Sequence, residues 1–221
     1  MGNIGRKMAL ALLLAVAAGC ASGRPLSLSG SLVPPEKPVS SDNVLPRVAV
    51  VDFEFSAPEN EAIGRDYDNV RPIQWKGSPG PVVADLVAAS LIGRGVPVVR
   101  VQMAGHVPAG VLVTVRGRVD LFRVDAKRIH SFRIESVAQV GMTVYAEGEG
   151  VPAGWSSGPV SSEVWSSEPF FVTPVGVREA LASAAEGAAD EAVRSLMKLS
   201  GRFSPAEGRP EPGAAVPPAP Q

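Results

Sequence analysis

Two long stretches that alternate between apolar and polar residues constrain the fold of this chain more than any other feature. In residues 111–120 the valines share one face and the charged residues take the other, and residues 132–147 repeat the pattern. A period of two over ten or more residues is typical of strands that bury one face and expose the other. We therefore predict two long strands, with a bulge near Leu121, where the apolar phase shifts, and a basic turn over residues 126–130.

Shorter elements surround these two strands. A near-continuous apolar run after Arg47 indicates a strand covered on both faces, Pro81 and Pro174 favour the first turn of a helix, and Thr173 is a predicted N-cap. The expected shorter strands are 47–55, 97–103 and 160–167, and the expected helices are 81–91 and 175–199. We predict an α+β fold, a mostly antiparallel sheet of about five strands with two helices packed on one face, flanked by disordered tails.

The amino terminus has the parts of a secretory signal. Arg6 and Lys7 form a basic region, and residues 8–18 form an uninterrupted apolar run followed by small residues. This run is shorter than the roughly 20 residues needed to cross the hydrocarbon core of a bilayer. Residues 1–19 are therefore predicted to be a cleaved signal peptide.

Cys20 is the only cysteine of the chain, and it directly follows Ala17, Ala18 and Gly19. This string resembles the lipobox of bacterial lipoproteins. The resemblance implies a diacylglycerol on the thiol of Cys20, cleavage before it, and an acyl group such as palmitate on the new amino terminus; Ala21 implies sorting to the outer membrane. Several acyl chains anchor a protein firmly, whereas one does not. The alternative is ordinary signal cleavage, after Ala17, which would leave a secreted protein with a free thiol.

The rest of the chain divides into a tether, one domain and a tail. Residues 20–46 are rich in Ser and Pro and are predicted to be a lipidated, flexible spacer. Residues 47–203 suffice for a single α+β domain with one core. Residues 204–221 are Pro-rich and expected to be disordered, and the polar stretch 56–80 is a loop that is either functional or mobile.

Few residues carry recognisable chemistry. His106 and His130 lie in predicted turns without ligand spacing, so no metal is expected. Asp52 and Glu54 would share one face of the first strand, which fits an acid–base pair but fits solvated acids at an amphipathic strand end better. The serines have no nucleophile-elbow motif and the glycines no phosphate-binding motif. We expect no catalytic residue, no cofactor and no enzymatic activity.

Charge is almost balanced, with 21 basic against 22 acidic residues, so nothing indicates binding to nucleic acid. A basic cluster lies on the predicted hairpin, with acidic residues between its members. We interpret it as a solvated, neutralised sheet face; the alternative is a site for anions or lipopolysaccharide. The cluster consists of Arg116, Arg118, Arg123, Lys127, Arg128 and Arg133, interleaved with Asp120, Asp125 and Glu135.

The order of short apolar strings supports a wider resemblance. The strings VAVVDFE, IGR (residues 63–65), GVPVV and VTVRGRVDLFRVD occur in that order after the leader and before an Ala-rich terminal helix. This arrangement is similar to small periplasmic lipoproteins of the YajG type, and more loosely to the α/β domain of the TolB amino-terminal region and of CsgG-type curli-secretion lipoproteins. The resemblance implies an accessory or assembly role in the envelope and brings no catalytic residue with it.

The sequence therefore favours a lipid-anchored protein on the periplasmic face of the outer membrane that binds envelope proteins or itself, without catalysis. Long strands with a free edge would suit strand-mediated association. The alternative function is a module that binds an envelope small molecule or lipid in a pocket beside residues 56–80. A hydrolase is the third and weakest hypothesis.

Overall fold

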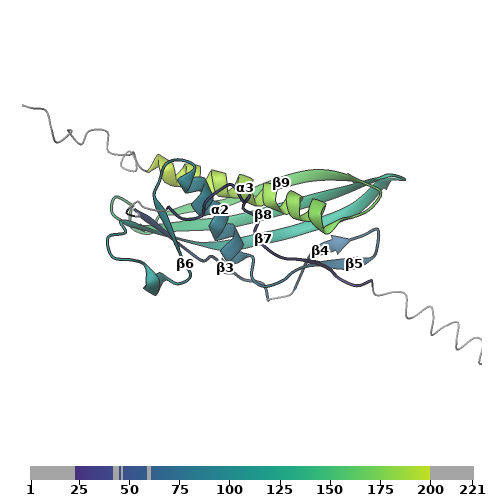
Figure 1. Cartoon of the computed structure of the whole chain (residues 1–221), viewed down its shortest axis with the longest axis horizontal. Helices are drawn as coiled ribbons and strands as arrows, with labels where there is room; N and C mark the ends of the chain where they lie inside the picture. Colours follow the sequence, from purple (N-terminus) through teal and green to yellow (C-terminus); the bar gives the residue numbers. More distant parts are fainter. Residues whose placement is uncertain (1–22, 42–44, 46, 59–60, 200–221) are drawn as a thin grey trace, which may run out of the picture.

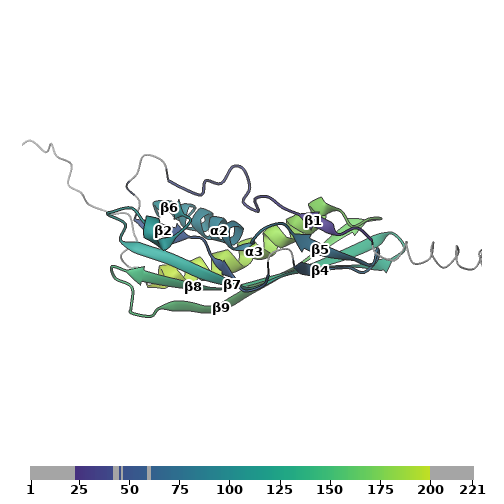
Figure 2. The same ribbon diagram turned by 90° about the horizontal axis from the view of Figure 1, so that it is seen from below.

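A computed structural model describes residues 23–41, 45, 47–58 and 61–199 (Figure 1). Cys20, the signal peptide and the Pro-rich tail lie outside the described residues, so the predictions made for them are not addressed by the fold. The described part consists of one mixed β-sheet and two long helices, and both helices lie on the same face of the long strands (Figure 2). Neither of these described helices has the length and apolar character needed to span a bilayer.

The described elements follow one another as nine strands and two α-helices, with one short 3-10 helix. The strands are β1 (Leu26–Leu28), β2 (Val48–Val51), β3 (Glu54–Phe55), β4 (Ala62–Asp66), β5 (Arg71–Trp75), β6 (Val98–Val101), β7 (Val113–His130), β8 (Arg133–Gly148) and β9 (Ser156–Pro169). The helices are α2 (Gly80–Ile92), η1 (Ala104–His106) and α3 (Pro174–Lys198).

The three longest strands form an antiparallel meander in the order β7, β8, β9. The register of β7 against β8 shifts between Val119 and Leu121, which confirms the predicted bulge. The other edge of β7 pairs with β2, β3 and β4 in succession, all parallel to it. The sheet continues from β2 to β6 and from β4 through β5 to β1.

The prediction of about five mostly antiparallel strands is wrong. The described residues form nine strands, and of their eight strand pairings five are parallel and three are antiparallel. Alternation within a strand shows which face is buried, but it carries no information about which strands lie at its edges. One 18-residue strand is long enough to accept three short partners end to end. The two helices and the α+β character agree with the prediction.

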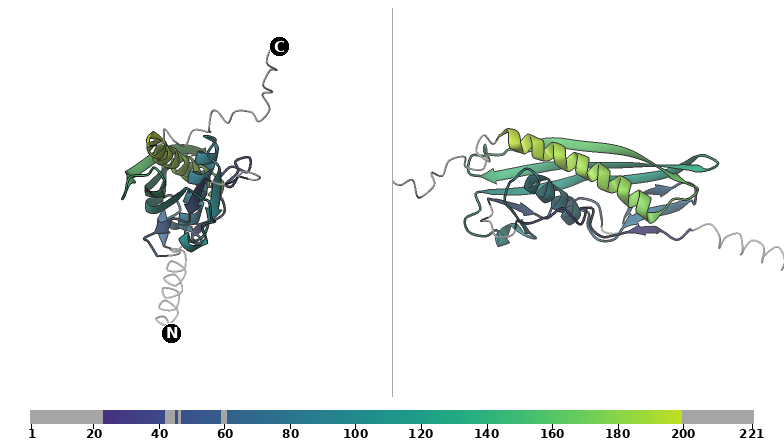
Figure 3. Two further views of the ribbon diagram at one scale, coloured as in Figure 1. Left: turned by 90° about the vertical axis from the view of Figure 1, so that its left-hand side faces the viewer. Right: turned by 45° about the horizontal axis from the view of Figure 1, so that its top comes forward.

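Helix α3 crosses the meander diagonally and covers β8 and β9 (Figure 3). Thr173 caps it as predicted, because its hydroxyl accepts a hydrogen bond from the Gly176 N–H at 3.0 Å. Small side chains let this helix approach the sheet closely: a Cβ added at Gly187 would lie 2.5 Å from the Ser162 hydroxyl. The buried stripe of α3 contains Leu181, Ala184, Ala185, Ala188, Ala192 and Leu196.

Part of the segment expected to be a spacer is packed on the domain. Strand β1 pairs in parallel with β5, and Leu26 and Leu28 are 5% and 2% exposed. Leu32 and Val33 are also buried. These four apolar side chains bury enough surface to order a segment whose composition is otherwise typical of a linker.

The stretch 56–80, expected to be a loop, contains the antiparallel pair β4–β5. Ile73 and Trp75 of β5 are buried, and the Trp75 ring packs edge-on against Phe122 of β7 with centroids 5.4 Å apart. The first predicted strand is instead interrupted at Asp52 and Phe53, which separate β2 from β3. The predicted basic turn is also strand, because β7 continues to His130 and the chain reverses at residues 131–132.

Candidate functional site

The candidate acid–base pair is divided between two environments. Asp52 accepts a hydrogen bond from the Arg100 guanidinium, which also donates to Asp85 at 2.7 Å and to the Val50 carbonyl. Glu54 is exposed and starts β3, whose backbone pairs with Arg118 and Val119 of β7. Asp52 therefore serves an ion-pair network, and the structure gives the two carboxylates different partners.

The two histidines are exposed at separate places in the fold. His106 ends the short helix η1 and His130 ends β7. Within the described ranges, no group of three or more His, Cys, Asp or Glu side chains is arranged to hold a metal ion.

The basic cluster forms ion pairs with acids close to it. Arg118 donates to Asp120 at 2.5 Å, and this hydrogen bond is the main reason that the pKa of Arg118 lies above its ordinary value. Arg123 pairs with Asp125 at 2.7 Å. These two contacts run along β7 between residues two positions apart, whereas Arg116 pairs across the strands with Glu147. The exposed arginines of β7 are thus neutralised locally.

The face of the meander opposite the helices carries the side chains that alternate with the core positions, and we call it the open face. Three of its apolar side chains, Leu121, Tyr145 and Trp165, are 38%, 42% and 61% exposed. The Trp165 indole donates to Glu163 at 2.7 Å. Hydrogen bonds from Gln139 first, and then from Trp165, lower the pKa of Glu163. This side-chain network fixes the orientation of the Trp165 ring.

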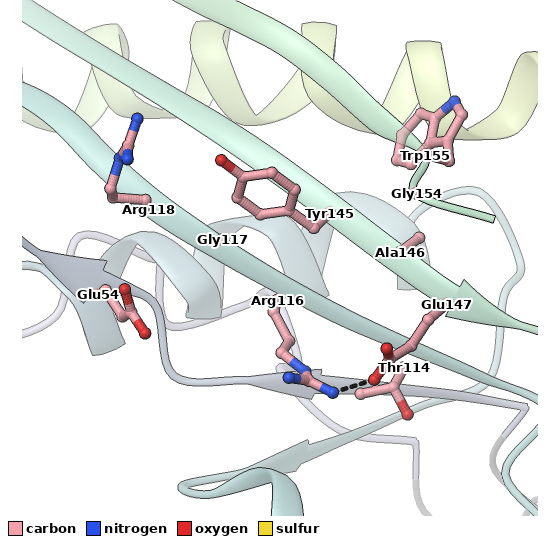
Figure 4. Close-up of a pocket in the computed structure, with 10 residues that line it drawn as sticks. All are labelled: Glu54, Thr114, Arg116, Gly117, Arg118, Tyr145, Ala146, Glu147, Gly154 and Trp155. Carbon is pink, nitrogen blue, oxygen red and sulfur yellow. Dashed lines mark hydrogen bonds and ion pairs between the residues drawn. The ribbon is translucent and has the colours of Figure 1, made fainter.

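A hollow of about 340 Å³ lies on the open face near the Gly148 end of β8. Figure 4 shows its walls, with Tyr145 and Trp155 on one side, Glu54 on the other, and the Arg116–Glu147 pair below them. Gly117 lines the hollow with its backbone alone, because a Cβ there would point to the core and lie 2.4 Å from the Phe53 ring. The ten lining residues include no histidine, cysteine or serine; they offer hydrogen bonds, charged groups and aromatic surface.

A second hollow, of about 670 Å³, lies between β4 and the bulged part of β7. Gly64 brings these strands close together there, because a Cβ on Gly64 would lie 1.6 Å from the Val124 carbonyl oxygen. The lining side chains mix apolar groups with two arginines and three carboxylates; they include Phe55, Ile63, Arg65, Tyr67, Leu121 and Arg123, with Glu61, Asp120 and Asp125. This hollow is beside the stretch 56–80, where the alternative function places a pocket.

Two further surfaces were not singled out from the sequence. One is the outer edge of β9, which pairs only with β8 among the described strands. The other is a group of exposed phenylalanines at the β7–β8 turn, where the Phe132 and Phe170 rings meet edge-on at 5.6 Å and Phe171 lies 6.5 Å from Phe170. The adjacent aromatics just before the Thr173 N-cap are the sequence signal that could have revealed this group.

Several solved structures match this chain over most of their own length. A Xanthomonas campestris protein of the DUF330 family is 13% identical, over 79% of this chain and 95% of that chain, with a TM-score of 0.43. The PelC dodecamer of Paraburkholderia phytofirmans is 17% identical over 71% and 94%, with a TM-score of 0.38. The rare lipoprotein B of Shewanella oneidensis is 14% identical over 67% and 93%, with a TM-score of 0.35.

At such low identities and TM-scores these likenesses carry no argument about what this chain does. No family model and no curated protein matches the sequence. The resemblance to the YajG type and to the TolB and CsgG domains is not confirmed by these matches and stays a prediction.

Proposed function

We propose that this chain is a bacterial envelope lipoprotein, anchored in the outer membrane through acyl groups on Cys20, whose periplasmic domain binds other envelope proteins without catalysing a reaction. The anchor is supported by the signal-like residues 1–19 and by the placement of the lone cysteine directly after them. The non-enzymatic role is supported by Asp52, because its ion pair with Arg100 gives this carboxylate a structural use.

The outer edge of β9 is the observation that carries the binding role. This strand is 14 residues long, and β8 is its only partner among the described strands. A free edge presents a row of backbone donors and acceptors to which another strand can add. We propose that a partner chain extends the sheet along β9.

Trp165 gives this edge a side-chain anchor. It projects from β9 on the open face, is 61% exposed, and is held by its hydrogen bond to Glu163. Exposed, oriented tryptophans often dominate the free energy of protein–protein binding. A partner strand beside β9 would cover this ring.

The edge can be tested by placing like charges along it. The double substitution Ser161→Lys and Ser167→Lys adds two cations at exposed positions of β9, and lysine on an edge opposes strand addition. The matched control is Ser183→Lys, an exposed serine on α3. Cells that produce each full-length protein would be treated with a short amine- and carboxyl-reactive cross-linker.

We expect cross-linked species of one defined mass with the original protein and with the control, and their loss with the double variant. Membrane fractionation of the same cells checks that all three proteins are anchored. Complexes that persist in the double variant contradict the role of β9, and a single uncross-linked chain in every case contradicts protein binding.

The anchor has its own test. Cys20→Ser removes the thiol that would carry the diacylglycerol, so we expect the protein to leave the membrane fraction and to lose incorporation of labelled palmitate. A Cys20→Ser protein that stays in the membrane with unchanged mobility contradicts the lipoprotein proposal.

The hollow between β4 and β7 favours a second candidate function, which is binding of an envelope small molecule or lipid. Its volume of about 670 Å³ falls in the range of small-molecule sites, and Arg65 could hold an anionic group, whereas Arg123 is already paired with Asp125. A strict monomer whose unfolding temperature rises with an anionic lipid, and does not rise after Leu121→Glu, would favour this function over the first.

A further inference from the structure

Exposed apolar side chains gather at the end of the molecule where three chain reversals meet. They come from the β4–β5 turn, the β7–β8 turn and the connection from β9 to α3, and their exposures run from 38% to 71%. Apolar groups that remain exposed together in this way mark contact surfaces. We call this group the apolar cap; it consists of Val70, Ile129, Phe132, Phe170, Phe171 and Val175.

The apolar cap is held rigidly by one arginine. Arg128 donates two hydrogen bonds to Asp68 in the β4–β5 turn, at 2.7 and 2.8 Å. It also donates to the carbonyl of Ser131 at 2.8 Å and to the carbonyl of Phe170 at 3.0 Å. The same guanidinium therefore ties all three reversals together, so the exposed side chains are presented in a fixed arrangement.

Two members of the cap are held in unfavourable backbone conformations. Val70 has φ of 51° and Phe170 has φ of 67°, and among the described residues these are the only non-glycine positions with positive φ. Both side chains are more than half exposed, so neither gains burial in return. Strain that the fold maintains at exposed positions points to a use for the side chains concerned.

The cap lies where the described chain begins. Gly23 packs against the β4–β5 turn, since a Cβ on it would lie 3.1 Å from the Asn69 carbonyl oxygen and 3.2 Å from Cβ of Arg71. Gly23 is three positions after Cys20, which limits the distance between their Cα atoms to about 11 Å. Figure 1 places β4, β5 and the β7–β8 turn at one end of the molecule and β6 at the other. Acyl chains on Cys20 would thus enter a bilayer beside the cap.

We propose that the apolar cap is a membrane-interface contact: in the protein lipidated at Cys20, the side chains of Phe132, Phe170 and Phe171 enter the headgroup region of the leaflet that holds the acyl chains. This inference rests on the anchor of the proposed function. Aromatic and aliphatic side chains are suited to that depth. The exposed basic groups of Lys127 and Arg133 lie beside the cap, where lipid phosphates would attract them.

Contact through the cap would set the orientation of the whole domain. The long strands run from the cap toward the opposite end of the molecule (Figure 1). With the cap in the interface, the meander would project away from the bilayer, and its open face and the edge of β9 would stay in water. Two attachment points, the acyl chains and the cap, would restrict the rotation of the domain relative to the membrane. An acyl anchor on a long flexible spacer would allow that rotation.

The lipidated full-length protein can report the depth of the cap directly. Because acylation consumes Cys20, a cysteine introduced elsewhere is the only free thiol of the mature chain. Phe171→Cys places a nitroxide spin label in the cap, and Met103→Cys places one at a comparably exposed site that follows β6 at the opposite end. Vesicles would contain phosphatidylethanolamine and phosphatidylglycerol at three to one.

We expect collisions with a water-soluble nickel complex to fall several-fold at residue 171 in vesicles relative to detergent-free, unlipidated protein that carries Cys20→Ser, while collisions with oxygen rise. The label at residue 103 should stay aqueous. Equal aqueous accessibility at both sites overturns the inference. Protection at residue 171 that disappears on dilution of the protein in lipid also overturns it, because a second copy would then cover the cap.

Acylation and flotation with the vesicles are measured on the same samples. Protein that is neither acylated nor floated refutes the anchor of the proposed function. Protein that is acylated and floated but leaves residue 171 in water refutes the membrane contact alone.

Discussion

Arg128 of β7 holds Asp68 of the β4–β5 turn through two parallel hydrogen bonds, from Nε to Oδ1 at 2.7 Å and from Nη2 to Oδ2 at 2.8 Å. Paired bonds of this kind give a guanidinium–carboxylate contact its directional strength. The hydrogen bond from Arg128 is the main cause of a pKa of Asp68 below its ordinary value. The contact therefore links the shape of the apolar cap to pH.

Low pH should weaken the contact between Arg128 and Asp68. Because the folded pKa of Asp68 is lowered, the unfolded chain binds this proton more readily than the folded chain does. The stability that Asp68 contributes is fully present above its unfolded pKa of about 3.9 and is lost as pH falls through the lower folded value. Asp68→Asn should therefore reduce the free energy of unfolding at pH 7 and flatten its decline in acid.

Urea denaturation of the unlipidated mature chain between about pH 7 and pH 2 would measure both effects. The control is Glu61→Gln, another acidic residue of the 56–80 stretch, which is exposed. An acid limb that is equally steep in Asp68→Asn and in the unsubstituted protein contradicts the linkage.

Gly64 should not tolerate a side chain. A Cβ at this position would lie 1.6 Å from the Val124 carbonyl oxygen, so β4 and β7 would have to separate. We expect Gly64→Ala to reduce the free energy of unfolding by about 2–3 kcal/mol, as overpacking against backbone does. The matched control is Gly105→Ala in η1, where a Cβ would meet nothing within 4 Å. Equal unfolding free energies for the two variants, measured in urea, would show that the strands can separate without cost.

The IGR string illustrates what could be learned from the sequence. It contributes to the family resemblance, but its physical reason is a close approach between Gly64 and Val124, sixty positions later. By contrast, the strand and helix elements with strong local signals were located correctly. The alternation of β7 and β8, the bulge after Val119 and the Thr173 cap each depend on neighbouring residues alone.

The features that were missed depend on which segments meet in space. The parallel partners of β7 are two to five residues long and too short to show a period, so the long strands alone predict an antiparallel sheet. In the sequence, Leu26 and Leu28 are isolated apolar residues in a segment with the composition of a linker. Their burial depends on the pairing of β1 with β5, which the local sequence does not reveal. The apolar cap combines residues from three distant turns, of which only the adjacent Phe170 and Phe171 stand out in the sequence. The anchor prediction at Cys20 rests on local sequence only.

Substituting Arg100 should reduce the free energy of unfolding more than substituting Glu54. The Arg100 side chain is 12% exposed and serves Asp52, Asp85 and the Val50 carbonyl, so Arg100→Met would leave two carboxylates without their shared cation. Because those carboxylates are 27% and 31% exposed, we expect a loss of about 2–3 kcal/mol in the free energy of unfolding, less than for a fully buried pair.

Glu54→Gln is the comparison for Arg100→Met and also addresses catalysis. Glu54 is exposed, and we expect the free energy of unfolding to change by less than about 0.5 kcal/mol. If the protein is not an enzyme, cells producing Glu54→Gln should also keep the cross-linked complexes of the original protein. A variant that is stable but loses every cellular function of the gene would instead indicate a chemical role for this carboxylate.

Replacing Val70 with glycine should stabilise the fold and weaken its contact with the membrane. Its φ of 51° is strained for a β-branched residue, and glycine would relieve about 1–3 kcal/mol of strain against an entropic cost of about 0.5–1 kcal/mol. Val70→Gly should therefore raise the free energy of unfolding by about 1 kcal/mol. Val70→Ala serves as the control, because it removes most of the apolar surface but keeps a Cβ at the strained position. Both variants should admit more nickel complex to the spin label at residue 171, and only Val70→Gly should be more stable. If Val70→Gly is more stable and leaves the depth of residue 171 unchanged, Val70 has no part in the membrane contact and its strain has another origin.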